Sequence, residues 1–159
     1  MTKNRLRILY LTAVVTLTAT TVMSCLQNTV FNEYRSTHIS GWDKTQLLEY
    51  DIPPIDIRGN YLETVGIRFT NDYPFTTLSL IVKQETFPSK TTVVDTLNCK
   101  FIDEKGNTKG HGLHLSQTDT LFRVLPLNTG DSIHVTIRHN MRRDVLPGIS
   151  DIGFKLDIK

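Results

Sequence analysis

Cys25 is the residue whose surroundings point most clearly to a chemical modification. Before it come three basic residues within the first seven positions, an apolar stretch over 8–23 and the small residue Ser24. A basic region, an apolar region and a small residue before the cleavage point are typical of a secretory signal peptide. The apolar stretch is shorter than the roughly 20 residues that a membrane-spanning helix needs. We therefore predict a signal peptide over 1–24 that is removed from the mature protein.

The residues Val22-Met23-Ser24-Cys25 resemble the lipobox of bacterial lipoproteins, in which an aliphatic residue, a tolerant position and a small residue precede cysteine. The resemblance implies that the thiol carries diacylglycerol and that the new amino group is acylated, with chains such as palmitate. Each buried methylene contributes about 0.8 kcal/mol, and stable anchoring needs more than one chain. Cys25 is the predicted lipidation site. The alternative is an ordinary signal peptide, with Cys25 incidental or in a disulfide.

Removal of the leader changes the charge of the chain. Taking 24 residues from 159 leaves 135, which is within the usual size of one domain. Three of the 18 Lys and Arg residues lie in the leader, so the mature chain has 15 against 16 Asp and Glu, a net charge of −1. A nearly neutral surface offers little counterion release, so nucleic acid is not an expected partner.

Cys99 is expected to be structural. With Cys25 acylated, Cys99 has no partner for an intramolecular disulfide, because the chain has only two cysteines. In the segment TLNCKFI, Leu97, Cys99 and Phe101 alternate with polar residues, which places the sulfur on the apolar face of a strand. A free cysteine there packs as a small apolar side chain.

The histidines do not form a recognisable metal site. His111 and His114 are three positions apart, and His134 and His139 are five apart, so on an extended strand each pair points to opposite faces. A zinc site assembled from separate strands is left as an alternative. We predict no metal and no cofactor.

Signatures of catalysis are missing from the sequence as well. The nucleophile pattern Gly-x-Ser-x-Gly and Gly-rich phosphate loops do not occur. The acidic residues are scattered, so spacing alone identifies no pair of catalytic carboxylates. We predict that the protein is not an enzyme and has no catalytic residues. A hydrolase is the alternative, and it would need a cleft lined by two close carboxylates or by a histidine beside a carboxylate.

Alternating apolar and polar residues dominate the mature chain and predict half-buried strands. The clearest runs lie at 61–69, 78–82, 133–137 and 152–158, with further candidates at 46–52, 91–102, 112–115 and 120–125. Turn signals such as Pro53-Pro54 and Asn71-Asp72 separate them, and no helical stripe follows the leader. We predict an all-β fold, an antiparallel, jelly-roll-like β-sandwich over 33–159, preceded by a lipidated N-terminus and linker over 25–32.

Four residues are candidates for contact with other molecules. Trp42 is expected to cover the open end of the sandwich, and its functional alternative is a platform on which a sugar stacks. Arg138 points outward by parity, and Arg142 and Arg143 follow in a loop. Together these arginines are candidates for a small cationic patch that binds lipid phosphates or an acidic partner. The alternative is a solvated edge with a local pair between arginine and Asp144, which adds little stability.

The C-terminal stretch RHNMRRDVLPGISDIGFKL resembles the end of the gliding-motility lipoprotein family GldH. The resemblance continues through NDYPFTTLSL and DTLNCKFIDEKGNTKGHGL, and it includes Cys25. It implies a cell-envelope lipoprotein of gliding Gram-negative bacteria and their non-gliding relatives, associated with the gliding apparatus and its linked protein secretion system. The family has no assigned biochemical activity. Five residues match the family pattern without a chemical role: Arg68, His139, Met141, Arg142 and Gly148.

Two functions from different classes follow from these features. The preferred hypothesis is a non-catalytic interaction module that docks onto other envelope proteins, with its lipid anchor confining both partners to one membrane surface. The alternative is a module that binds glycan or peptidoglycan, with Trp42, Tyr34 or Tyr73 as stacking platforms. The residues directly after Cys25 contain no acidic run of the kind that directs surface export and no Asp of the kind that favours retention at the inner membrane. We therefore predict the periplasmic face of the outer membrane.

Overall fold

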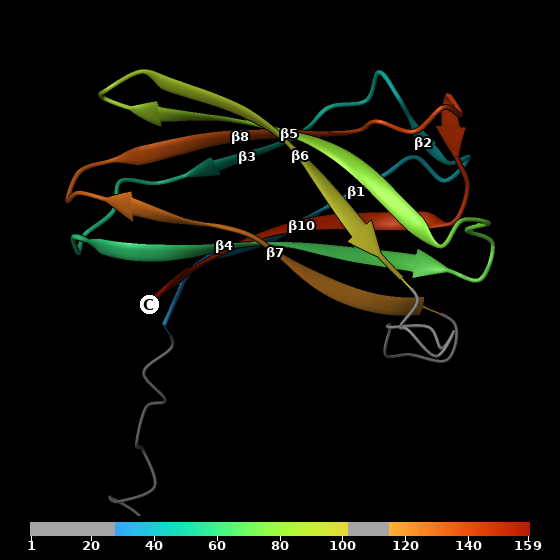
Figure 1. Cartoon of the computed structure of the whole chain (residues 1–159), viewed down its shortest axis with the longest axis horizontal. Helices are drawn as coiled ribbons and strands as arrows, with labels where there is room; N and C mark the ends of the chain where they lie inside the picture. The colour runs from blue at the N-terminus through green and yellow to red at the C-terminus, as the bar shows by residue number, and fades with distance from the viewer. Residues whose placement is uncertain (1–27, 102–114) are drawn as a thin grey trace, which may run out of the picture.

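The computed structural model describes residues 28–101 and 115–159. These residues form ten strands and no helix, and the strands make two stacked layers (Figure 1). The strands are β1 (Thr29–Ser36), β2 (Trp42–Asp43), β3 (Leu48–Ile52), β4 (Gly59–Thr70), β5 (Thr77–Phe87), β6 (Thr91–Lys100), β7 (Leu115–Leu127), β8 (Ser132–His139), β9 (Val145–Leu146) and β10 (Ile149–Ile158).

The two layers are four-stranded sheets with the orders β1-β10-β4-β7 and β3-β8-β5-β6. Every pairing between neighbouring strands is antiparallel, and β2 and β9 form a separate two-stranded ribbon. Eight strands in two four-stranded sheets, with neighbours that are mostly distant in the sequence, give the jelly-roll arrangement. The predicted all-β, antiparallel sandwich fold is confirmed.

The core lies between the two sheets and follows the predicted alternation. In β8, Ile133, Val135 and Ile137 are at most 2% exposed, and the residues between them are half-buried. Full burial of such a side chain contributes about 1.5–3 kcal/mol. Cys99 is fully buried, as its parity predicted, and burial raises the pKa of its thiol to about 11.

The structure shifts some predicted boundaries. β1 begins at Thr29, and Phe31 is buried against the core, so residues 29–32, which were predicted to be part of a linker over 25–32, belong to the sandwich. The predicted strand at 46–52 begins two residues later, because Asp43 holds a turn: Thr45 N donates to Asp43 Oδ1 at 2.7 Å and Gln46 N to Asp43 O at 3.0 Å. The candidate strand at 112–115 lies outside the described residues except for Leu115.

The sandwich has two ends that differ in construction. At the terminus end, Ile158 N donates to Asn28 O at 2.7 Å and Lys159 N to Asn60 O at 2.9 Å. At the loop end lies the β2–β9 ribbon (Figure 1). The loop over 140–148 also lies there; it follows β8, includes the two residues of β9 and leads into β10. The ten-residue strand β10 connects the two ends. At 3.3 Å per residue they are about 30 Å apart.

The described residues contain no helix with the length and apolar character required to cross a bilayer.

Candidate functional site

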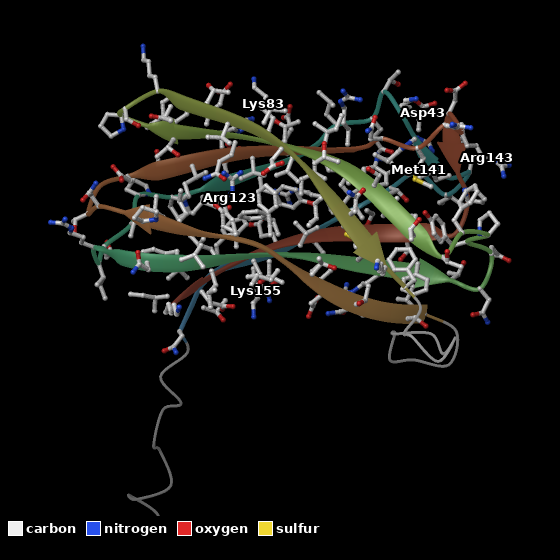
Figure 2. All side chains as sticks on the ribbon, viewed as in Figure 1. Asp43, Lys83, Arg123, Met141, Arg143 and Lys155 are labelled. Carbon is white, nitrogen blue, oxygen red and sulfur yellow. The ribbon has the colours of Figure 1, made fainter. Side chains whose placement is uncertain are left out.

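The loop end contains the residues that the sequence singled out. β8 ends at His139, and the chain then crosses to β9, which pairs with β2 through Trp42 opposite Leu146. Lys44 N donates to Asp144 O at 2.8 Å and ties the ribbon to the loop. Figure 2 labels Arg143, Asp43 and Met141 at this end of the sandwich.

Trp42 closes the core beneath this loop. Its side chain is fully buried, its Nε1 donates to Gln46 O at 3.2 Å, and its ring meets the His139 ring edge-on with centroids 5.2 Å apart. A sugar cannot stack on an enclosed ring, so Trp42 is no surface platform in this structure and covers the end of the sandwich instead. Burial also lowers the pKa of His139 below its ordinary value of 6.5, so this imidazole is neutral at pH 7.

The loop over 140–148 is held by packing and by one glycine. Met141 N donates to His139 Nδ1 at 3.4 Å, and Met141 Sδ accepts from Ser79 N at 3.5 Å. Gly148 has φ +77°, and a Cβ there would overlap the backbone of Tyr73. These contacts give His139, Met141 and Gly148 structural roles. Arg142 is exposed and has none of these roles.

The three arginines of the predicted patch have no ion pair with any residue that the structure describes. Arg138 lies on the outer face of β8, opposite Ile81 of β5, and is half-buried, whereas Arg142 and Arg143 are exposed in the loop that follows β8. Within residues 28–101 and 115–159, no salt bridge includes any of them. The local pair with Asp144 that the sequence suggested does not form, so two guanidinium groups face solvent at the loop end.

Other side chains pack against the two tyrosines that were named as alternative glycan platforms. Tyr73 is 8% exposed and packs edge-on against Phe101 with centroids 5.2 Å apart. The guanidinium of Arg68 covers the Tyr34 ring, with its Cζ 3.8 Å from the ring centroid. This stack also gives Arg68 a structural role on the outer face of the β4 sheet.

A half-buried histidine of β8 lies beside an exposed carboxylate of β3. His134 Nδ1 is 2.6 Å from Asp51 Oδ1, and His134 Nε2 is 3.4 Å from Thr136 Oγ1. The order carboxylate, imidazole, hydroxyl is that of a hydrolase triad. However, β8 is paired on both sides, by β3 and β5, so its backbone N–H groups are engaged in the sheet and are not free to serve as oxyanion-hole donors. Sequence spacing missed this pair because its members are 83 positions apart.

A charged pair lies inside the sandwich. Glu63 of β4 is fully buried, with Oε2 3.0 Å from Arg123 Nε, but the contact lacks hydrogen-bond geometry and is purely ionic. Figure 2 labels Arg123 between the two layers. Burial raises the pKa of Glu63 to about 7, and Arg123 opposes that rise. In the sequence, Glu63 interrupts the apolar alternation of the run 61–69, and its spacing gives no indication of a partner.

Two surface pockets are lined by other residues than the His134–Asp51 and Glu63–Arg123 pairs. One of about 500 Å³ lies at the terminus end and is lined by Arg58, Gly59, Asn60, Pro126, Leu127 and Asn128. The other, about 340 Å³, lies at the loop end and includes His38, Asp72 and Asp151. Ser36 Oγ and Ser150 Oγ donate to Asp151, and no hydrogen bond or ion pair among the described residues joins His38 to either carboxylate. The part of the chain that the structure describes also places no three metal-binding side chains together.

The fold and this site therefore define a jelly-roll domain with a packed core and a cationic loop at one end. Residues 29–156 match the family model described as GldH lipoprotein. The chain belongs to the GldH lipoprotein family. Cys25, the residue with the clearest predicted modification, lies outside the described residues.

Two curated relatives carry the same family name. The chain is 33% identical over 150 residues to the gliding motility lipoprotein GldH of Flavobacterium johnsoniae, covering 90% of this chain and 93% of the relative. It is 29% identical over 143 residues to the gliding motility lipoprotein GldH homolog of Christiangramia forsetii, covering 84% and 86%. Both names describe a gliding motility lipoprotein.

Solved structures give more distant similarities. Part of a family GH115 4-O-methyl-α-glucuronidase matches 86% of this chain with a TM-score of 0.46 and 14% identity, and the match covers 19% of that enzyme. The globular domain of the zebrafish complement 1qA protein matches 80% of this chain and 94% of its own, with a TM-score of 0.41 and 14% identity.

Proposed function

We propose that the protein is a lipid-anchored, non-catalytic interaction module of the gliding apparatus and its associated protein secretion system. The observation that carries the proposal is the position of Arg142 and Arg143. Both are exposed and without an ion pair among the described residues, and they lie at the end of the sandwich opposite the start of β1. Family membership and the motility names of the relatives support the same function.

The anchor in this proposal is Cys25, which would tie the terminus end to the membrane. Only residues 26–28 separate Cys25 from β1, which starts at Thr29. Four peptide steps at roughly 3.5 Å each span at most about 14 Å. The domain therefore stays at the membrane surface. We assign it to the periplasmic face of the outer membrane, because the residues directly after Cys25 contain no acidic run and no Asp.

The loop end then serves a protein partner with an acidic surface. Arg142 and Arg143 lie about 30 Å along β10 from the end that the anchor holds. Guanidinium groups bind carboxylates through paired hydrogen bonds, each of them worth about 1.5–3 kcal/mol when well formed. A buried plug of Trp42 and His139 supports the loop from below, so the arginines start from a fixed position.

The test is a photo-crosslinking experiment in the native host. A photoreactive amino acid at Asn140, which is exposed in the same loop, should capture an envelope protein. Adding Arg142→Glu and Arg143→Glu should remove that product and reduce gliding or secretion in a complemented deletion strain. The matched control is Lys90→Glu with Lys100→Glu, two exposed lysines on the β5–β6 hairpin, which should leave the product unchanged.

Two results would contradict the proposal. Equal capture with and without the loop arginines would remove them from the interface. Full complementation by Cys25→Ala, in a chain that stays soluble in the periplasm, would show that the anchor is dispensable.

A further inference from the structure

The four edge strands of the sandwich differ in how they resist pairing with another chain. An edge strand has unpaired N–H and C=O groups, and proteins usually protect them with bulges, proline, charge or short length. β1 has a register shift between Thr29 and Phe31, and β7 has one opposite Glu63 and Thr64 as well as Pro126. β3 has only five residues and ends before Pro53. Each of these edges therefore has a protective feature.

β6 lacks most of these features. It pairs with β5 over ten residues without a register shift, it contains no proline, and its six residues from Thr91 to Thr96 are all exposed. Val93 and Val94 are 38% and 62% exposed, on opposite faces of the strand. Within the described residues β6 is the last strand of its sheet, so its outer edge has no partner.

The hydrogen bonds of β6 identify which groups are free. Phe101 N donates to Thr76 O, just before β5, at 2.9 Å. The backbone N–H and C=O groups of odd-numbered β6 residues therefore point toward β5, and those of even-numbered residues point toward the open edge. Asp95 Oδ1 accepts from Thr96 N at 2.7 Å and closes that position. The backbone groups of Thr92 and Val94 remain for a fifth strand.

We propose that β6 pairs antiparallel with β6 of a second copy of this chain, over Thr91–Asp95. In this register Val93 faces Val93 of the second copy, Thr92 faces Val94, and Thr91 faces Asp95. The open-edge groups of Thr92 and Val94 then complete four backbone hydrogen bonds. No like charges lie opposite each other, whereas the register centred on Asp95 would place two carboxylates face to face.

The geometry of this pairing suits two chains in one membrane. The two-fold axis of an antiparallel strand pair is perpendicular to the sheet, so it leaves both β1-β10-β4-β7 layers on the same side. β1 belongs to that layer, and the chain reaches Cys25 from the start of β1. Both anchors therefore emerge on one side, as attachment to a single bilayer requires.

The pairing depends on the proposed anchor for its strength. Five residues per copy bury far less than the roughly 1,200 Å² of a stable interface. Confinement to one membrane surface raises the effective concentration of the second copy and compensates for the small contact. We expect dimers in the membrane and monomers after solubilisation in detergent at low concentration.

Disulfide trapping of the full-length chain in host membranes tests this register. Val93→Cys should give a disulfide-linked dimer on oxidation, because facing residues of a non-hydrogen-bonded pair have Cα atoms about 4.5 Å apart. Val94→Cys should not, because its two copies are two residues apart along the strands, about 6.6 Å, and about 4.8 Å apart across them, so their Cα atoms are farther apart than the roughly 7 Å that a disulfide can bridge. Leu121→Cys, on the exposed edge of β7, and the wild type, whose Cys99 is buried, should also remain monomers.

A second variant separates loss of pairing from loss of fold. Val94→Pro removes an N–H that faces the open edge and is not used by β5, so the sheet is kept while the dimer of Val93→Cys is lost. Monomeric Val93→Cys in the membrane fraction would overturn the self-pairing and leave the anchor intact. A crosslink only to a different protein, or equal dimers with Leu121→Cys, would overturn it too. A chain that leaves the membrane fraction would refute the anchor and, with it, the confinement that this pairing requires.

Discussion

The terminus end and the loop end of the sandwich are closed by different means. At the terminus end, main-chain hydrogen bonds from Ile158 and Lys159 join β10 to its neighbours on both sides. At the loop end, side chains fill the opening: Trp42 lies over His139, and Phe69 stacks on Phe101 with ring centroids 4.4 Å apart. A loop that rests on a rigid aromatic plug can present charged residues at a fixed position. A terminus held by main-chain bonds can bear the pull of an anchor.

The largest effect is expected from removing the plug. Trp42→Ala should destabilise the domain by about 3–5 kcal/mol, because it leaves a cavity in a closed core. Trp42→Phe, which keeps an aromatic ring, should cost clearly less. Urea unfolding of the purified protein measures both. A loss below about 1 kcal/mol for Trp42→Ala would mean that side-chain packing does not close the loop end.

The charged pair inside the sandwich should make stability fall as pH rises. The pKa of Glu63 is about 7 in the folded protein, against 4.5 as its ordinary value, so the folded state holds the proton more tightly. Stability from this group is therefore lost as pH rises from about 4.5 to 7, by an amount on the order of 3 kcal/mol.

The matched variant for this prediction is Glu63→Gln, which keeps the shape of the side chain and removes its titration. Its stability relative to the wild type should increase between pH 5 and pH 8. Parallel pH profiles of the two proteins would contradict a raised pKa at Glu63.

Two glycines with positive φ, one at each end of the sandwich, allow the two ends to be compared directly. Gly148 at the loop end has φ +77° and no room for a Cβ, and Gly130 in the β7–β8 turn at the terminus end has φ +88° and open space around it. Gly130→Ala should cost about 1 kcal/mol for the left-handed backbone alone. Gly148→Ala should cost at least about 2 kcal/mol more, because the Tyr73 backbone must move. Thermal unfolding of both variants decides whether the close approach matters.

The buried imidazole of His139 should make folding stability fall as pH decreases, whereas Glu63 makes it fall as pH increases. Burial lowers the pKa of His139, so on acidification the unfolded chain takes up this proton before the folded one does. Stability should therefore decrease as pH falls below 6.5. His139→Gln should flatten this part of the profile, and an unchanged profile would place His139 in contact with water.

The smallest effect on stability is expected at the loop arginines. Arg142→Ala and Arg143→Ala should each change the free energy of unfolding by less than about 0.5 kcal/mol, because both side chains are exposed and unpaired among the described residues. Chemical denaturation of the double variant checks this. A large loss would turn the proposed partner site into part of the fold.

The sequence predicted the fold well because the signal is local. Alternation in segments such as SIHVTIRH places Ile133, Val135 and Ile137 on one face, and the structure buries all three. The start of β1 was missed because Phe31 is its single core residue over 29–32, which is too little for a period to be visible.

The groups that could do chemistry were harder to find, because strands distant in the sequence bring them together. Asp51 meets His134 across β3 and β8, and Glu63 meets Arg123 across β4 and β7. Neither pair has a spacing signature. Trp42 shows the opposite case: its residue type favoured closure of the sandwich and left a stacking platform as the alternative, and its complete burial supports closure.

The early start of β1 limits how the domain explores its surroundings once the anchor is in place. With the anchor proposed at Cys25, a body that begins four residues later would pivot and drift within the plane of the bilayer and would not reach a structure far from that membrane. Whatever it binds has to arrive at, or already reside in, the same membrane. Encounter then becomes a two-dimensional search, in which crowding of the membrane sets the rate of assembly.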